Sequence, residues 1–145
     1  MKGLDTNVLV RYLTQDDHRQ ARIATSQIEA AAKRDEKLLI RPLVLCELVW
    51  VLESAYGFGK TEIVHVLDLM MRTAQFEIAQ KEIVWQALDE YNLGKGDFSD
   101  YYLGIANEDD GAEVTLTFDK GLKGSKFFPS IMLCKPWSIG ELHPI

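Results

Sequence analysis

The sequence predicts an α/β fold in which a central parallel sheet of about five short strands is flanked by helices on both faces. Short apolar runs alternate with amphipathic segments along the chain, a pattern typical of parallel strands joined by helices. The 145 residues suffice for one domain that buries a core without disulfide or metal staples. No repeat, low-complexity tract or linker interrupts the chain, so residues 1–145 are expected to form a single domain.

The first half of the chain supplies two strands and three or more helices. The first strand ends near Asp5 and leads into a helix. Apolar residues then recur at steps of three and four through residues 17–33, which predicts a second helix. Leu38–Ile40 is the next strand, and proline opens a helix over Pro42–Tyr56 that ends at a Gly-Phe-Gly stretch. A further helix is expected to begin with Thr61 as its N-cap.

The second half continues the alternation. Residues 76–79 form a candidate strand, and residues 83–91 carry the clearest helical stripe. Gly94-Lys95-Gly96 ends that stripe, and residues 98–108 are expected to form a helix. The β-branched and aromatic residues 114–118 predict a strand after the Asp110-Gly111 turn, and residues 131–133 predict the last one. The loop 120–129, with its glycines and lysines, is expected to be mobile.

Composition narrows the function classes. The formal net charge is −6, which argues against tight, metal-free, non-specific binding to nucleic acid. No apolar run approaches the roughly 18 residues that cross a bilayer, and polar residues interrupt any secretory signal at the N-terminus. We therefore expect a cytoplasmic protein without a membrane partner. Cys46 and Cys134 lie in apolar surroundings and are interpreted as reduced packing residues.

Five carboxylates, distributed over the chain, stand out because each lies near the start or end of an expected strand or helix. If the apolar runs are neighbouring parallel strands, their ends converge on one crevice. A crevice lined with carboxylates repels itself unless it holds a cation. Without these five groups the formal charge would be −1, so most of the acidity belongs to the expected crevice. The five residues are Asp5, Glu47, Asp97, Asp100 and Asp119.

Each of these carboxylates also has a simpler local interpretation. Asp5 suits the N-cap of a helix, and Glu47 would be ordinary on a solvent-facing helix surface. Asp97 and Asp100 have the spacing of a capping box, in which Asp97 is the better cap and Asp100 the better metal ligand. Asp119 precedes Lys-Gly and fits a turn. The joint pattern, rather than any single residue, favours a site.

Four short motifs together resemble the PIN-domain ribonucleases and, more narrowly, the VapC toxins of bacterial type II toxin–antitoxin pairs. They occur in the expected order and cover essentially the whole chain. The motifs are Asp5-Thr6-Asn7-Val8-Leu9-Val10-Arg11-Tyr12-Leu13, the helix containing Pro42-Leu43-Val44-Leu45-Cys46-Glu47-Leu48, Asp97-Phe98-Ser99-Asp100, and Thr117-Phe118-Asp119.

The resemblance implies a Mg²⁺- or Mn²⁺-dependent endoribonuclease that hydrolyses RNA phosphodiesters by metal-activated water and leaves 5′-phosphate and 3′-hydroxyl ends. Oxygen-only ligands suit these hard cations. The implied catalytic residues are Asp5, Glu47, Asp100 and Asp119, and Asp97 joins them as an accessory metal ligand. Thr6, Asn7 and Thr117 would be supporting polar groups. The basic residues expected to steer phosphates are Arg11, Lys120, Lys123 and Lys126.

The chain departs from many members of the resembled family at two places. Arg41 stands before the proline where they have serine or threonine, and Tyr101-Tyr102 follows Asp100 where they have alanine. The tyrosines would narrow the crevice or offer a surface for base stacking. The resemblance also implies a homodimer and a small antitoxin partner. Two alternatives stay open: a receiver-like phosphoacceptor domain, and a PIN scaffold that binds a partner without catalysis.

Overall fold

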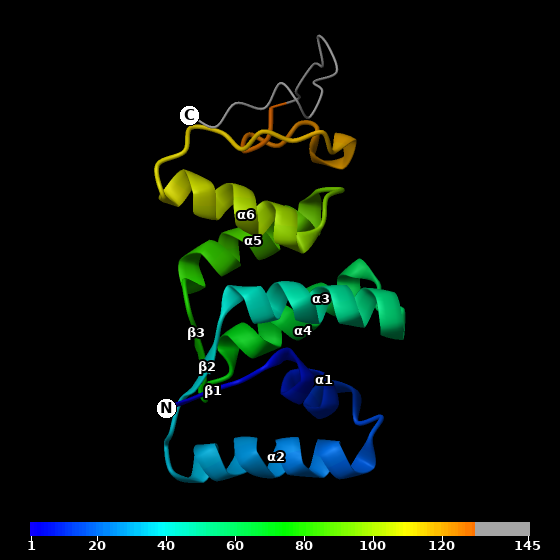
Figure 1. The fold of residues 1–145 in the computed structure, drawn as a ribbon, viewed down its shortest axis with the longest axis vertical. Helices are drawn as coiled ribbons and strands as arrows, with labels where there is room; N and C mark the ends of the chain where they lie inside the picture. Colours follow the sequence, from blue (N-terminus) through cyan, green and yellow to red (C-terminus); the bar gives the residue numbers. More distant parts are fainter. Residues whose placement is uncertain (130–145) are drawn as a thin grey trace, which may run out of the picture.

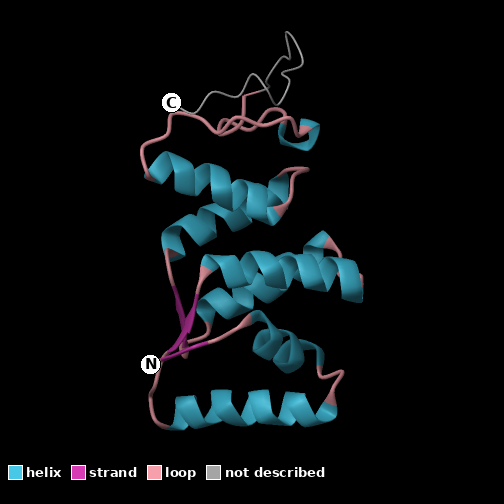
Figure 2. Ribbon diagram, in the orientation of Figure 1, coloured by secondary structure: helices cyan, strands magenta, loops and turns pink. Residues whose placement is uncertain are grey.

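The computed structural model describes residues 1–129 and contains a small parallel sheet flanked by six helices (Figures 1 and 2). The sheet consists of β1 (Lys2–Gly3), β2 (Leu38–Ile40) and β3 (Phe76–Ile78), in the order β1-β2-β3. Both pairings are parallel, and Leu38 of the central strand is in register with Lys2 and Phe76. The prediction of a parallel α/β fold is confirmed, but the described residues contain three strands rather than about five.

The helices lie one after another along the long axis of the molecule, with α2 at one end and α6 toward the other (Figure 1). Neighbouring helices pack against each other, and the helix pair α5 and α6 has the most extensive contact. The sheet lies beside the stack, so the chain enters several helices directly from strand ends. The helices are α1 (Thr6–Thr14), α2 (His18–Lys33), α3 (Pro42–Tyr56), α4 (Lys60–Arg72), α5 (Lys81–Leu93) and α6 (Phe98–Asp109).

Local chemistry explains most of the helix ends. The Asp17 carboxylate accepts a hydrogen bond from the Gln20 amide at 2.9 Å and caps α2. Pro42 occupies the first turn of α3, and Gly57 ends that helix in the left-handed conformation. The prediction for α4 was wrong by two residues, because Gly59 rather than Thr61 is its N-cap.

The strand predicted over residues 114–118 does not form. These residues run as an extended segment in which Thr117 makes an isolated bridge, and they pair with no other strand in the described part of the chain. The side chains of Val114, Leu116 and Phe118 are exposed, whereas Thr115 and Thr117 are half-buried. The alternation of a strand is therefore present, but within residues 1–129 it is not accompanied by a ladder of strand pairing. The last predicted strand, residues 131–133, lies outside the described residues.

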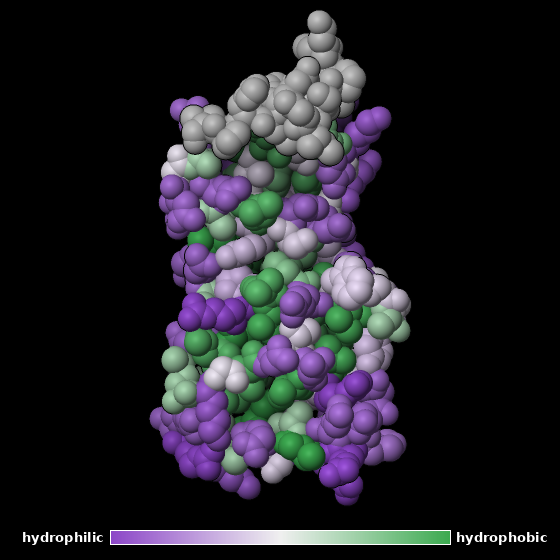
Figure 3. Space-filling view, in the orientation of Figure 1, coloured by the Kyte–Doolittle hydropathy of each residue, from purple (hydrophilic) through white to green (hydrophobic). Residues whose placement is uncertain are grey.

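One continuous hydrophobic core includes side chains from all six helices, with Leu122, Phe127 and Phe128 closing it beyond α6. No helix among the described residues is long and apolar enough to cross a membrane. Figure 3 shows hydrophobic surface gathered over the middle of one face, in the region of α3 and α4, between more hydrophilic parts. On α3 itself, Leu43 and Trp50 are 68% and 69% exposed, so this helix presents apolar side chains to solvent as well as to the core.

Candidate active site

Parallel pairing places the carboxyl ends of all three strands at one edge of the sheet. Asp5 follows β1 at this edge and occupies the N-cap position of α1. Its side chain makes no capping hydrogen bond, although the backbone has the extended conformation of an N-cap. The capping interpretation of Asp5 is therefore wrong for its side chain, and the carboxylate lies exposed at the edge where ligands of open α/β sheets bind.

A side-chain hydrogen bond connects the first motif to the second. The hydroxyl of Thr6, which is only 7% exposed, donates to Oε2 of Glu47 at 2.5 Å. Glu47 lies on the exposed surface of α3, which packs directly against α1. A buried hydroxyl thus fixes one oxygen of an exposed carboxylate next to the helix that Asp5 begins.

Two further carboxylates, those of Asp97 and Asp119, act on Asp100 in the first turn of α6. Partial burial raises the pKa of Asp100, the nearby Asp97 and Asp119 carboxylates raise it further, and a backbone hydrogen bond from Asp97 acts in the opposite direction. Asp97 occupies the N-cap position of α6, but its side chain makes no capping hydrogen bond. The expectation that Asp97 serves as a cap is thus wrong for its carboxylate, and Asp100 lies in the first helical turn, where the helix dipole favours negative charge.

Asp119 is held by its own loop. One carboxylate oxygen accepts a hydrogen bond from the Gly121 amide at 2.7 Å, and the Asp119 amide donates to the Thr117 hydroxyl at 3.0 Å. The turn interpretation is confirmed for this residue. It is compatible with a site, because Thr117 and Gly121 orient a carboxylate that still reaches Asp100 electrostatically.

Cys46 is a half-buried residue of α3, directly before Glu47. Burial raises the pKa of its thiol to about 11, and the negative charges of Asp100 and Glu47 contribute to this. Asp100 of α6 therefore acts on a thiol next to Glu47 of α3, and these two helices are in contact. Within residues 1–129, however, no three Asp, Glu, His or Cys side chains are close enough together to hold a metal ion. The oxygen donors suit Mg²⁺ or Mn²⁺, and their mutual repulsion is relieved by a cation.

The basic residues expected near RNA lie in different settings. Arg11 forms an ion pair with Asp16 at 2.9 Å and also donates to Gln20 and Tyr56. Lys126 lies over the ring of Phe127, with 4.8 Å between Nζ and the ring centroid. Arg11 is thus part of a polar network at the end of α1, and Asn7 lies beside it along the apolar cavity between α1 and α2.

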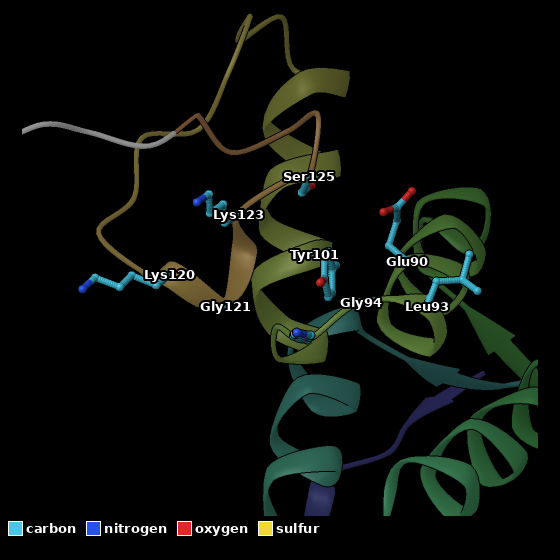
Figure 4. A pocket seen from close by; sticks show the side chains of 10 residues that line it. Glu90, Leu93, Gly94, Tyr101, Lys120, Gly121, Lys123 and Ser125 are labelled. Carbon is cyan, nitrogen blue, oxygen red and sulfur yellow. The ribbon is translucent and has the colours of Figure 1, made fainter.

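Lys120 and Lys123 border a cavity of about 470 Å³ between the end of α5 and the loop after Asp119. Figure 4 shows their side chains extending away from Glu90, which lies across the cavity on α5. Lys95 also lines this cavity and stands two residues before Asp97. Sequence reasoning missed Lys95, although its position between two glycines before an acidic motif was a usable signal.

Gln80 is a second residue that sequence reasoning missed. It follows β3 at the same edge of the sheet as Asp5 and accepts a hydrogen bond from the Tyr102 hydroxyl at 2.6 Å. A polar residue directly after a buried strand was the available signal. Tyr101 is buried and its hydroxyl accepts from the Gly96 amide, so of the two adjacent tyrosines Tyr102 is the one at the surface.

Comparison with known proteins identifies the family of the chain. The family model described as PIN domain matches residues 3–124. The chain belongs to the PIN-domain family. A VapC ribonuclease of Aquifex aeolicus (strain VF5) is 26% identical over 123 residues, which cover 85% of this chain and 90% of the relative. No solved structure gives a significant match. The match to a PIN domain favours this family over the receiver class.

Proposed function

We propose that this PIN domain is a metal-dependent endoribonuclease and the toxin component of a type II toxin–antitoxin pair. The observation that carries the proposal is the group of acidic side chains around Asp100. Asp97 and Asp119 both raise the pKa of that partly buried carboxyl, and neither Asp97 nor Asp5 uses its side chain to cap the helix it begins. Neighbouring carboxylates whose negative charges raise the pKa of one of their number favour a cation-binding role over a structural one.

The residues divide into distinct roles. Asp5 and Asp100, with Asp97 as an accessory, would hold Mg²⁺ or Mn²⁺, and Asp119 would hold a second ion if one binds. The metal would supply Lewis acidity toward the phosphate and activate the attacking water. Glu47, oriented by the Thr6 hydroxyl, would position water, while Thr117 orients Asp119. Lys120 and Lys123 would attract the RNA backbone. We propose a cytoplasmic location for the enzyme, where RNA substrates are present.

A matched pair of charge-neutralising variants tests this proposal. Purified wild-type protein, Asp5→Asn and Asp89→Asn would be incubated with total RNA in Mg²⁺ or in chelator, and the new 5′ ends would be mapped. Asp89 is an exposed carboxylate on α5, outside the candidate site. We expect cleavage by wild type and Asp89→Asn in Mg²⁺, no cleavage in chelator, and at least a hundredfold loss in Asp5→Asn, comparable to losing a major catalytic group. The products should carry 5′-phosphates.

Cleavage by Asp5→Asn at the wild-type rate would contradict the assignment of the site. Cleavage that survives the chelator would contradict the metal dependence instead. Products with 2′,3′-cyclic phosphates would show that the RNA 2′-hydroxyl, rather than water, attacks the phosphate.

Partner binding is supported by the exposed surface of α3. Leu43 and Trp50 lie on either side of Glu47 along the helix and are largely exposed. Exposed apolar side chains beside a functional site are typical of protein-interaction surfaces. A homodimer and an antitoxin that covers the carboxylates are the proposed partners.

A further inference from the structure

Tyr102 and Gln80 form a polar and aromatic pair that the proposed cleavage chemistry does not use. The Tyr102 hydroxyl, on α6, donates to Oε1 of Gln80, directly before α5. Tyr102 is half-buried and packs against the core, whereas Gln80 is exposed. The hydrogen bond therefore holds an aromatic ring and an amide in one arrangement at the surface, which lowers the entropic cost of binding a ligand there.

The backbone at Gln80 is unusual for a residue with a side chain. Its φ and ψ angles of 53° and 43° lie in the left-handed region. Gln80 also occupies the N-cap position of α5, yet its side chain makes no capping hydrogen bond and is bonded to Tyr102 instead. Backbone conformations of this kind cost energy and are common where a side chain is positioned for binding.

The pair borders the carboxylates without being part of them. Gln80 leaves β3 at the edge where Asp5 leaves β1, two strand spacings away, which corresponds to roughly 10 Å. Tyr102 lies on α6 two residues after Asp100, and α6 is in contact with α3, the helix that carries Glu47. The ring and amide are thus placed to contact a part of the substrate next to the reacting phosphate rather than the phosphate itself.

We propose that Tyr102 and Gln80 bind one unpaired base of the RNA next to the cleaved bond, and that they favour guanine and uracil. This inference rests on the proposed ribonuclease function. A base stacks on the exposed part of the Tyr102 ring. Oε1 of Gln80 is engaged by Tyr102, so the amide nitrogen is the group that faces the base. It donates to the carbonyl oxygens of guanine and uracil, whereas adenine and cytosine present amino groups at the corresponding positions.

Cleavage of a single-stranded RNA library with random sequence tests this base preference. We expect wild-type protein to enrich guanine and uracil at one position beside the cleaved bond. Gln80→Glu keeps the Tyr102 hydrogen bond but replaces the donor by an acceptor, so the preference should change to adenine and cytosine. Tyr102→Ala should lower kcat/KM about tenfold and remove the preference, as expected for the loss of one stacked base. Tyr56→Phe, which loses a tyrosine hydroxyl hydrogen bond to Asp16, is the matched control and should keep the wild-type preference.

A binding experiment separates this inference from the proposed function. Asp5→Asn protein, with and without Gln80→Glu, would be titrated into fluorescently labelled oligouridine and oligocytidine, and anisotropy would be measured. We expect oligouridine to bind several-fold more tightly, with the order reversed in the double variant. If wild-type protein cleaves no RNA, the proposed function fails. The difference in affinity between oligouridine and oligocytidine still decides whether the base site exists. Equal affinities, or an order unchanged by Gln80→Glu, would overturn the inference even if the protein cleaves RNA.

Discussion

At the scale of single residues, Thr6 connects the motif that contains Asp5 to the helix that contains Glu47. Its buried hydroxyl donates to Glu47, 41 positions later in the chain. Thr6→Val keeps the volume and removes the donor, so Glu47 loses its fixed orientation. We expect the RNA cleavage rate to fall about tenfold while the free energy of unfolding falls by about 1 kcal/mol. Steady-state cleavage of a short RNA and urea unfolding measure the two effects.

Thr6→Ser is the control for this experiment, because serine keeps the hydroxyl. It should retain most of the cleavage rate despite the loss of a buried methyl group. If Thr6→Val cleaves as fast as Thr6→Ser, the hydrogen bond to Glu47 has no part in catalysis, and Thr6 is a packing residue.

At the scale of elements, a polar network fixes the turn between α1 and α2 against the end of α3. The Asp16 carboxylate accepts hydrogen bonds from Tyr56, Thr14 and Arg11. These bonds, led by the one from Tyr56, hold the pKa of Asp16 well below its ordinary value of 3.8. A carboxylate with a depressed pKa in the folded state stabilises the fold above its unfolded pKa, and that contribution is lost as the pH falls toward the folded value.

Asp16→Asn should therefore lower the urea midpoint at neutral pH. The difference between wild type and variant should stay constant down to about pH 5 and narrow below about pH 4. Urea unfolding followed by circular dichroism across this range measures the difference. Asp35→Asn, at an exposed position away from this network, should show no such narrowing. If the urea midpoint of wild type exceeds that of Asp16→Asn by the same amount in strong acid, the depressed pKa of Asp16 does not contribute to stability as proposed.

Helices were predicted well because their signals are local. The three- and four-residue spacing over residues 17–33 and the proline that opens α3 depend only on neighbouring positions, and both helices form as expected. The start of α4 was missed because Thr61 is a good cap in general, whereas the Glu62 carboxylate accepts from the Gly59 amide here. Residues 114–118 lack such a local determinant. Their alternation is that of a strand, but strand pairing depends on a distant partner that local pattern does not specify.

The candidate site likewise has features that the sequence predicts and features that only the fold determines. The positions of Asp5, Asp97 and Asp100 at helix starts could be predicted, because N-cap and first-turn preferences are local. The hydrogen-bond partners of these side chains could not be predicted from the sequence. Whether an N-cap carboxylate bonds to its own helix or faces another carboxylate depends on helix packing. The contact of Glu47 with Thr6, and of Tyr102 with Gln80, likewise joins residues that only the fold brings together.

At the scale of the whole molecule, the acidic charge and the stability are coupled through the site. The protein has a formal net charge of −6, and the raised pKa of Asp100 means that ionising this group in the folded state costs free energy. For an acid whose folded pKa is raised, stability falls as the pH rises through that pKa, and the cost is present wherever the group is ionised. A bound divalent cation would remove this cost, whereas a neutral side chain at position 100 would remove it without metal.

Thermal unfolding tests this coupling. The Tm would be measured for wild type, Asp100→Asn and Asp89→Asn, each in Mg²⁺ and in chelator. In chelator, Asp100→Asn should have a Tm equal to or a few degrees above that of wild type, because it lacks the partly buried charge. Mg²⁺ at about a hundred times its Kd should raise the Tm of wild type and Asp89→Asn by roughly 5 °C or more, and that of Asp100→Asn much less. Equal shifts in all three proteins would mean that Mg²⁺ binds elsewhere on the acidic surface. A large loss of stability in Asp100→Asn without metal would instead make Asp100 a structural residue, since a carboxylate held among others for binding stabilises the fold only when its cation is present.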